Sequence, residues 1–296
     1  MRVAVLGLGR MGAPIAERLR AAGHELSVWN RSPPATEPFR ERGIRTLERP
    51  SDAWRHADLV ITMLANDEAL LAVTLGEDGL LSTSAGRERP DGSPCLAEMS
   101  TVSVAVSSEL GEAASTRGVD YLRAPVTGNP SVVVAGDLGI VVSGPESVFE
   151  RLAPTLRDIG PNLFYVGDGE QARAVKLALN LMVGGTTQLL AEALVLAERH
   201  GLERRKMLEV ISGSAIGSPY VRYKAAGLVA DDYVSTFTAS LLHKDLSLAL
   251  DAGHEMGVPL PLTAATQQLV ESCIAIGMGD LDLSVLVPRL RRDAGG

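Results

Sequence analysis

A glycine-rich segment near the start of the chain has the residue types and spacing of a phosphate-binding turn: Gly7, Leu8, Gly9, Arg10, Met11 and Gly12. It follows the apolar run Val3–Leu6 and precedes a helical pattern, which is the context that dinucleotide binding requires. The first glycine permits a tight turn, the second lets the backbone approach a pyrophosphate, and the third lets the helix pack closely on the strand. N–H groups at the helix start then face the phosphates. The alternative is a glycine-rich turn without a ligand, since the chain holds 30 glycines.

Three residues at the end of the second predicted strand indicate which dinucleotide would bind. NAD-binding proteins usually carry an acidic residue there, which accepts a hydrogen bond from the ribose 2′-hydroxyl. This chain has Asn30, Arg31 and Ser32 instead. Arginine can hold a 2′-phosphate and stack on the adenine, and serine can donate to the phosphate. We therefore predict NADP(H) as the cofactor; the alternative for Arg31 is an ordinary surface arginine.

Lysine is scarce in this chain, which makes its positions informative. The lysines are Lys176, Lys206, Lys224 and Lys244, and every other strongly basic residue is arginine. Lys176 and Asn180 are four residues apart in a helical pattern and therefore share a face. Lysine can lose its proton when buried and arginine effectively cannot, so a proton-transfer role would require lysine. The alternative for Lys176 is a salt-bridged residue at a helix start.

Short β runs alternate with helical patterns in the first half of the chain. This alternation predicts an α/β fold of Rossmann type, with a doubly wound, largely parallel sheet covered on both faces. The predicted strands are Arg2–Leu6, Glu25–Trp29, Asp58–Met63, Cys95–Glu98, Val119–Leu122, Leu138–Val142 and Asn162–Val166. The clearest helices between them are Met11–Ala22, Val102–Arg117 and Glu146–Ile159.

Strand patterns stop after Val166, and the remainder is predicted to be all helical. The expected helices are Glu170–His200, Glu203–Ser212, Tyr220–Val229, Ala239–Met256 and Pro261–Ile276. We place the domain boundary at the segment Gly167-Asp168-Gly169, which precedes the helical run. The chain is thereby divided into a dinucleotide-binding domain, 1–166, and an all-α substrate and dimerisation domain, 167–296.

Composition limits the classes of protein to which the chain can belong. Hydrophobic residues make up 46% and charged residues 22%, as in a globular protein. A net charge of −8 without a dense Lys/Arg run argues against nucleic-acid binding. The five histidines and two cysteines lack metal-ligand spacing, so we predict no metal site. The distant Cys95 and Cys273, and a strand pattern directly after Met1 that leaves no room for a signal peptide, predict a cytoplasmic protein.

The stretch Leu177–Ala191 carries no charge and is rich in leucine, methionine and valine. It also contains Asn180 and further polar residues, and a membrane span needs about 20 apolar residues. We therefore predict a helix buried between domains or subunits, and no membrane association. An uncharged helix face near Leu189–Leu196 predicts a homodimer or higher homo-oligomer, since such surface is rarely left in water.

Together these motifs resemble the β-hydroxyacid dehydrogenase family, which includes 3-hydroxyisobutyrate dehydrogenases, tartronate semialdehyde reductases and the related imine reductases. The resemblance covers nearly the whole chain and rests on several motifs in the expected order. These are the glycine segment 7–12, Ser100-Thr101, Ala124-Pro125-Val126-Thr127-Gly128, Gly167-Asp168-Gly169 followed by Lys176 and Asn180, and Lys244-Asp245-Leu246.

The resemblance implies roles for individual residues. Lys176 matches the family's catalytic lysine, and Asn180 matches the asparagine one turn later. Lys244 matches the lysine that closes over the cofactor from the helical domain; its alternative is a surface or phosphate contact. The remaining matches are the substrate-anchoring Thr127, Gly128 and Asn129, and the residues near the nicotinamide, Met63, Leu64 and Thr101, of which Thr101 also faces the substrate.

Several positions depart from the family pattern. Arg123 stands where aspartate often precedes Ala-Pro-Val, Thr127 replaces serine, and Asn129 replaces a second glycine. Leu179 stands where a further asparagine is often found. Arg123 is either a plain solvated side chain or a change in the polarity of the substrate loop. The identity of the substrate is therefore left open.

The resemblance implies reversible hydride transfer between NADPH and the carbonyl carbon of a small aldehyde or keto acid, in an interdomain cleft beyond the carboxyl ends of the strands. Lys176 would protonate the developing alkoxide, and Asn180 would fix its ammonium group. Thr127 and Gly128 would hold the substrate carboxylate through hydroxyl and N–H donors. Two alternatives are an imine reductase, which tends to carry aspartate or tyrosine at the position of Lys176, and a non-catalytic NADPH-binding protein.

Overall fold

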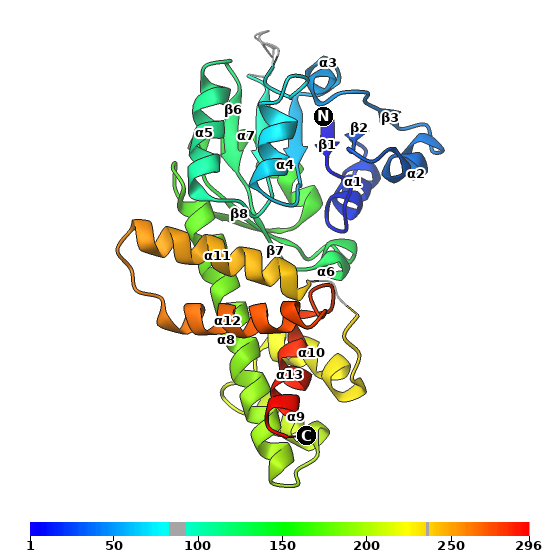
Figure 1. Ribbon diagram of the computed structural model, residues 1–296. Coiled ribbons are helices and arrows are strands. Elements are labelled where there is room, and N and C mark those ends of the chain that lie inside the picture. The colour runs from blue at the N-terminus through cyan, green and yellow to red at the C-terminus, as the bar shows by residue number, and fades with distance from the viewer. Residues whose placement is uncertain (83–92, 235–236, 296) are drawn as a thin grey trace. The chain divides into compact units, whose positions relative to one another are not determined.

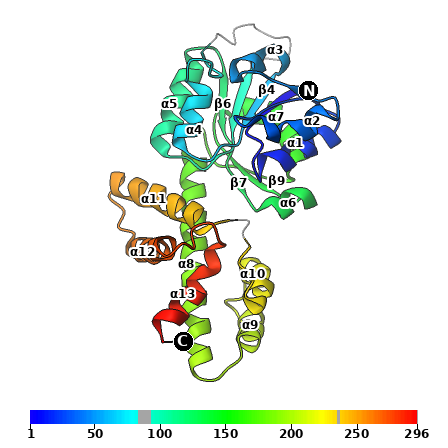
Figure 2. The same ribbon diagram turned by 45° about the vertical axis from the view of Figure 1, so that its right-hand side comes forward.

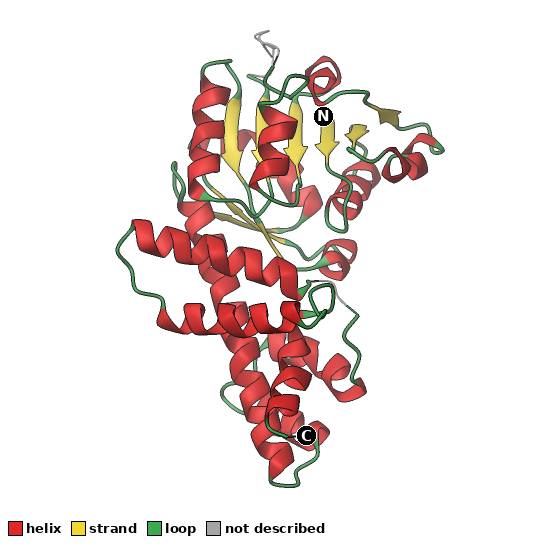
Figure 3. Cartoon of the chain, in the orientation of Figure 1, coloured by secondary structure: helices red, strands yellow, loops and turns green. Residues whose placement is uncertain are grey.

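The structure, a computed structural model, describes residues 1–82, 93–234 and 237–295 (Figure 1). The chain divides into two compact units, Met1–Lys176 and Leu177–Gly296. The described strands all belong to the first unit, and the second is helical (Figure 3). The predicted Rossmann-type α/β fold followed by an all-α region is thus confirmed. The helix α8 (Gln171–Arg199) runs across the division, whereas the boundary predicted from the sequence precedes this helix.

The main sheet of the first unit has six strands in the order β3-β2-β1-β4-β5-β6. Every neighbouring pair is parallel, and Val5 lies beside Val28 on one side and Ile61 on the other. All six carboxyl ends therefore lie at one edge of the sheet. The strands are β1 (Arg2–Leu6), β2 (Glu25–Trp29), β3 (Arg45–Thr46), β4 (Leu59–Thr62), β5 (Cys95–Glu98) and β6 (Asp120–Arg123).

Helices cover both faces of this sheet, as Figures 1 and 2 show. Val3 and Val5 pack with Ile15 of α1 (Gly12–Ala21) and with α7 (Glu146–Ile159). The alternate strand positions pack on the other face with α4 (Asp67–Thr74) and α5 (Val104–Ser115). Burial on both faces explains why these strands are almost continuously apolar.

A separate three-stranded sheet completes the first unit. It consists of β7 (Val126–Thr127), β8 (Gly139–Val142) and β9 (Asn162–Tyr165), with β7 antiparallel to β8 and β8 parallel to β9. The sequence pattern predicts β8 and β9 but assigns them to one sheet with the rest. It also misses β3 and β7, which have two residues each, and the helices α2 (Glu37–Arg40), α3 (Ala53–His56), α4 and α6 (Pro130–Ala135).

The helical unit contains the rest of α8 and the helices α9 (Arg204–Gly213), α10 (Pro219–Ala230), α11 (Ala239–Glu255), α12 (Pro261–Ala275) and α13 (Leu286–Asp293). Its core joins Leu194 of α8 with Leu242 and Leu246 of α11 and Val270 of α12. The predicted helices agree with the observed ones within two residues at each end, and α13 is an addition.

The α8 helix is the one described helix that is long and apolar enough to cross a membrane, with a mean hydropathy of 1.3 over its most apolar window. Half of that window is buried in the structure. The buried polar side chains of Arg173, Asn180, Thr187 and Gln188 lie on this helix. Such a combination is typical of the core helix of a folded domain.

Candidate active site

The glycine turn after β1 has a geometry that other residues cannot adopt at two of its three positions. Gly7 has φ +101°, and a Cβ there would lie 2.3 Å from the carbonyl oxygen of Met63. A Cβ on Gly12 would lie 1.9 Å from the carbonyl oxygen of Gly7. Beside Gly9, in contrast, no heavy atom lies within 4 Å of the Cβ position. The turn is thus tight where it packs and open where a pyrophosphate would approach, so it fits a dinucleotide.

The loop after β2 is tied to this turn by Asn30. The side-chain oxygen of Asn30 accepts a hydrogen bond from the Leu8 N–H at 2.9 Å, and its Nδ2 donates to the carbonyl oxygen of Ser32 at 3.1 Å. The Leu8 side chain is buried in the core. Asn30 and Leu8 therefore shape the cofactor-binding loops, and their polar groups are already engaged within the protein.

The residues predicted to contact the cofactor's charged groups are exposed. Arg31, Ser32 and Arg10 lie on the surface, and Met11 is half-buried at the start of α1. Within the ranges that the structure describes, Arg31 makes no hydrogen bond or ion pair with another side chain. Its guanidinium therefore retains all of its donors for a ligand.

The loops after β4 and β5 are joined at the same edge. The Leu64 N–H donates to Oγ of Ser100 at 2.8 Å, and the Ser100 N–H donates to a carboxylate oxygen of Glu98 at 2.7 Å. Met63, Leu64 and Thr101 are half-buried. The structure thus brings the predicted nicotinamide-side residues together with the glycine turn, which contacts Met63.

Lys176 lies on α8, and the first turn of this helix is attached to the same edge. Arg173, three residues earlier, donates to the carbonyl oxygen of Ser100 at 2.8 Å. It also forms an ion pair with Glu98. Lys176 is half-buried and follows directly on this attachment. Sequence reasoning missed Arg173 and Glu98, whose role depends on a contact between distant segments.

In the helical unit, one carboxylate holds both remaining site residues. Asn180 donates from Nδ2 to Oδ2 of Asp245 at 2.6 Å, and Nζ of Lys244 lies 2.8 Å from Oδ1 of the same side chain. Asn180 and Asp245 are buried, at 5% and 3% exposure. Since a carboxylate only accepts, the amide nitrogen of Asn180 faces Asp245, and its oxygen is not used by this bond. Asp245 was part of a predicted motif, but the sequence assigned it no role.

The predicted substrate segment leads from β7 into α6. Thr127 is half-buried, and Gly128 has φ +138°, which favours glycine. The side-chain oxygen of Asn129 accepts hydrogen bonds from the Val132 N–H at 3.1 Å and from the Ser131 hydroxyl at 2.6 Å. Asn129 therefore caps α6, which explains an asparagine at this position.

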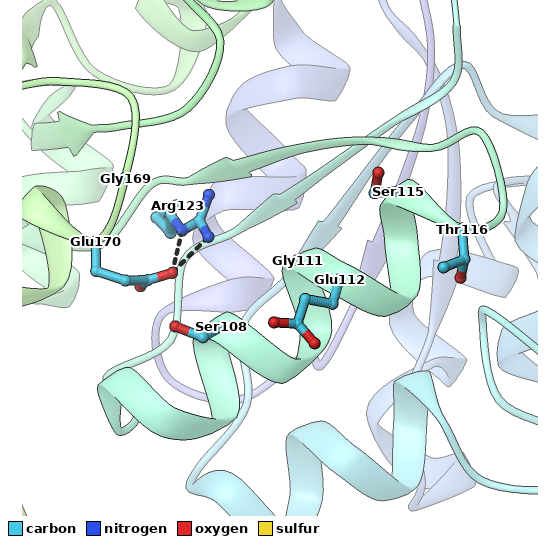
Figure 4. Close-up of a pocket in the computed structure, with 8 residues that line it drawn as sticks. All are labelled: Ser108, Gly111, Glu112, Ser115, Thr116, Arg123, Gly169 and Glu170. Atoms are coloured by element: carbon cyan, nitrogen blue, oxygen red, sulfur yellow. Dashed lines mark hydrogen bonds and ion pairs between the residues drawn. The ribbon is translucent and has the colours of Figure 1, made fainter.

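Arg123 is paired and is not the solvated side chain that was one of its two alternatives. Its Nε donates to a carboxylate oxygen of Glu170 at 2.6 Å, and its guanidinium lies 4.6 Å from the ring centre of Tyr121. The side chain is 13% exposed. Figure 4 shows this pair beside a recess of about 720 Å³ that Ser108 and Glu112 of α5 also line. None of the predicted site residues lines that recess.

The site has the features that binding of a dinucleotide requires. No group of three or more His, Cys, Asp or Glu residues among those described could hold a metal ion. A sheet with the strand order of a dinucleotide-binding fold and a glycine turn open at Gly9 are typical of a nicotinamide-dependent oxidoreductase.

Comparison with known proteins identifies the family. The family model of the NAD-binding domain of 6-phosphogluconate dehydrogenase matches residues 2–167, and that of the NAD-binding part of NADP-dependent 3-hydroxyisobutyrate dehydrogenase matches residues 170–290. The chain belongs to the β-hydroxyacid dehydrogenase family, whose members are NAD(P)-dependent dehydrogenases and reductases. The resemblance seen in the sequence is thus confirmed.

Individual relatives match over almost their whole length. An uncharacterized oxidoreductase of Bacillus subtilis is 36% identical over 97% of this chain and 99% of its own. The 2-(hydroxymethyl)glutarate dehydrogenase of Eubacterium barkeri is 34% identical over 97% of this chain and 94% of its own. The structure of a Mycobacterium tuberculosis 3-hydroxyisobutyrate dehydrogenase with L-serine is similar with a TM-score of 0.86, at 29% identity, over 98% and 99% of the two chains.

The different surroundings of Gly9 and Gly12 give a testable pair of variants. In Gly9→Ala, the added methyl enters open space, so thermal stability should be unchanged while affinity for the nicotinamide dinucleotide falls by about tenfold or more, a loss of about 1.4 kcal/mol. In Gly12→Ala, the methyl overlaps the Gly7 carbonyl, and stability should fall by about 1–3 kcal/mol. Thermal denaturation and fluorescence titration measure the two effects. Undiminished cofactor binding by Gly9→Ala would place the pyrophosphate elsewhere.

Proposed function

We propose that this protein is an NADP(H)-dependent oxidoreductase that interconverts a small β-hydroxyacid or alcohol and its aldehyde or keto form, with Lys176 as general acid and base. One observation carries the proposal. The helix that bears Lys176 is bound through Arg173 to Ser100, in the same loop as Thr101 at the carboxyl edge of the sheet. A titratable side chain thus emerges beside the strand ends that would carry the nicotinamide.

The proposed chemistry divides between the cofactor and the protein. Bound NADPH supplies a hydride to the carbonyl carbon. Lys176 gives a proton to the carbonyl oxygen and takes it back in the reverse direction. Asn180, one turn further on α8, has its amide nitrogen held by Asp245, so its oxygen can accept from the Lys176 ammonium. Asp245 therefore sets the orientation of the amide that orients the lysine.

Substrate binding is assigned to the segment after β6. The Thr127 hydroxyl and the Gly128 N–H are donors for a carboxylate, with Thr101 as a further polar contact. Asn129 contributes by fixing the start of α6, and its own side-chain oxygen is occupied. Lys244, held by Asp245, is proposed to reach the cofactor from the helical unit.

The identity of the residue at position 176 bears on the two competing functions. Imine reductases tend to have aspartate or tyrosine at this position, so the lysine favours reduction of a carbonyl. A non-catalytic NADPH-binding protein would not need Lys176 and Asn180 on one face of α8, with the Asn180 amide held by Asp245. A substrate panel followed by NADPH absorbance distinguishes these functions: 3-hydroxyisobutyrate or 2-(hydroxymethyl)glutarate with NADP+ tests the proposed one, an imine with NADPH tests imine reduction, and a non-catalytic protein turns over none of them.

We also propose a cytoplasmic location and self-association. Cys95 and Cys273 are both unpaired and buried, as is usual for proteins of a reducing compartment. On α8, Met182, Leu189 and Leu196 are 63%, 56% and 65% exposed and recur every seven residues, so they form one apolar stripe. A second copy of the chain would cover this stripe.

Arg31 supports NADPH as the preferred cofactor, because it is exposed and no acidic residue follows β2. Arg31→Ala should weaken NADPH binding by roughly 10- to 150-fold, which corresponds to the loss of about 1.5–3 kcal/mol for a charge-assisted contact. NADH binding should be nearly unchanged. Titration of both cofactors measures this. Equal affinity of the unmodified protein for NADPH and NADH would show that Arg31 does not select the cofactor.

Self-association is tested by sedimentation. The unmodified chain should sediment as a dimer or larger at micromolar concentration, and the double variant Leu189→Lys/Leu196→Lys should be monomeric. The matched control is Ile216→Lys, at an apolar side chain that is 75% exposed and lies outside α8. An unmodified chain that stays monomeric would refute the stripe as an interface.

Lys176 is tested by comparing two substitutions. Lys176→Ala should lower kcat by about 10²- to 10⁴-fold, the usual contribution of a general acid, while NADPH still binds. Lys176→Arg keeps the positive charge but cannot readily release a proton, so it should be nearly as impaired. The exposed Lys206, replaced by alanine, is the control. High activity of the arginine variant would reduce Lys176 to an electrostatic role, and normal turnover in both variants would remove it from the mechanism.

A further inference from the structure

Arg173, in the first turn of α8, is among the largest side chains that the structure buries, with 1% of its surface exposed. Its Nε donates to Oγ of Ser107 at 3.1 Å, and Nη1 donates to the carbonyl oxygen of Ser100 at 2.8 Å. Its Nη2 pairs with the carboxylate of Glu98, which is completely buried. The Glu98 carbonyl oxygen and the Tyr121 hydroxyl, each 3.4 Å from Nη2, are further acceptors, so the guanidinium is held in fixed directions.

The pair is charged in spite of its burial. Burial is the largest single influence and lowers the pKa of the Arg173 guanidinium, but Glu98, Tyr121 and Glu170 together raise it by more, so its pKa ends above the ordinary value. Buried ion pairs of this kind often add no stability over apolar side chains of similar size. What a planar guanidinium adds is geometry, since its donors are arranged in a rigid fork. An apolar contact would allow α8 to rotate or slide; this contact specifies one position.

The network around Arg173 reaches two of the loops assigned to the cofactor. Glu98 accepts the Ser100 N–H at 2.7 Å, and the Ser100 hydroxyl accepts the Leu64 N–H at 2.8 Å. The residues after β4, the residues after β5 and the first turn of α8 are thus connected by consecutive hydrogen bonds. A displacement of Arg173 would therefore shift the first turn of α8 relative to the two loops, which stay joined to each other by the bond between Leu64 and Ser100.

The surrounding contacts hold α8 at its start but do not replace the Arg173 fork. Oγ of Ser143, at the end of β8, donates to the Gly169 carbonyl at 2.7 Å and accepts the Ala172 N–H at 3.2 Å. Glu170 pairs with Arg123 at the end of β6. These contacts precede Arg173 in the chain, so Arg173 is the contact of this group nearest to Lys176.

We propose that Arg173, paired with Glu98, is a positioning residue that fixes Lys176 relative to the loops bearing Leu64 and Thr101. The inference deepens the proposed function and rests on its assignment of Lys176. Lys176 follows Arg173 by three positions, an axial rise of about 4.5 Å, so the two side chains are neighbours along the helix. A displacement of about 1 Å at a reacting group can lower a rate about 100-fold.

The decisive variant neutralises both partners. Replacing one partner alone leaves a buried charge unpaired, whereas replacing both by uncharged groups of similar size can leave stability nearly unchanged. Glu98→Gln/Arg173→Met is therefore expected to fold and bind NADPH normally but to lose about 100-fold in kcat. The control, Arg151→Met, removes the pair of Arg151 with Asp120 (2.6 Å), which connects α7 to β6 in the same unit. It should retain full kcat.

The assay uses 3-hydroxyisobutyrate and 2-(hydroxymethyl)glutarate as substrates with NADP+. For each variant, kcat, KM and the dissociation constant of NADPH are compared with those of the unmodified protein, so that a loss of turnover is distinguished from weaker binding. A stable double variant with normal kcat overturns the proposal, because the pair would then be structural only. Should the double variant fail to fold, Arg173→Lys supplies the comparison. It keeps the charge opposite Glu98 but lacks the fork, and it is expected to show the same selective loss of kcat; normal turnover would overturn the proposal.

A second measurement does not depend on activity. The chain has four lysines, so selective ¹³C,¹⁵N-lysine labelling of the NADP+-bound protein gives four side-chain signals, and Lys176→Arg assigns one of them. This signal should shift or broaden in Glu98→Gln/Arg173→Met and stay in place in Arg151→Met. An unmoved signal overturns the positioning role. If the unmodified protein oxidises neither substrate, the proposed function is in question, and the lysine signal still decides the position of Lys176.

Discussion

Parallel pairing of the strands is the constraint on which the site depends. The strands β1, β2, β4 and β5 all run in one direction, so Gly7, Asn30, Met63 and Ser100 must meet at one edge of the sheet. In the strand order 3-2-1-4-5-6, successive connections leave β1 in opposite directions, and a crevice forms where they part. Gly7 and Met63 come from the two strands at that point. The 2.3 Å between the Met63 oxygen and a Cβ on Gly7 explains why the crevice requires glycine there.

A second constraint connects this edge to α8. Charged groups inside a protein must be paired, and Arg173 of α8 finds its partner in Glu98 at the end of β5. The helix that carries Lys176 is thereby attached to the loops assigned to the cofactor. Arg123 and Glu170 form a further pair at the same helix start, so the arginine that replaces the family's usual aspartate is matched by an acid and presents no unpaired cation to the substrate segment.

The sequence predicts most of the fold because long elements have strong periods. Strands buried on both faces read as continuous apolar runs, and α7 is predicted to the residue, Glu146–Ile159. Elements such as β3 and β7, with two residues each, are too short to show a period. The division into two sheets depends on pairing between distant segments, which a local pattern does not contain.

The same distinction applies to the site. Motifs with a local meaning, such as the glycine turn and the Lys176–Asn180 pair on one helix, can be found in the sequence. The roles of Arg173, Glu98 and Asp245 cannot, because each depends on a partner 65 or more residues away. Asn129 and Asn30 were assigned to ligands by position, and the structure shows their side chains engaged within the protein.

The central claim is that Lys176 exchanges a proton with the substrate oxygen at the edge where the nicotinamide lies. A crystal structure with NADP+ and a bound β-hydroxyacid measures this directly. We expect Nζ of Lys176 within hydrogen-bonding distance of the substrate hydroxyl, about 2.6–3.2 Å, and the 2′-phosphate beside Arg31. A substrate hydroxyl contacted by another titratable side chain, with Nζ of Lys176 turned away from it, would contradict the assignment.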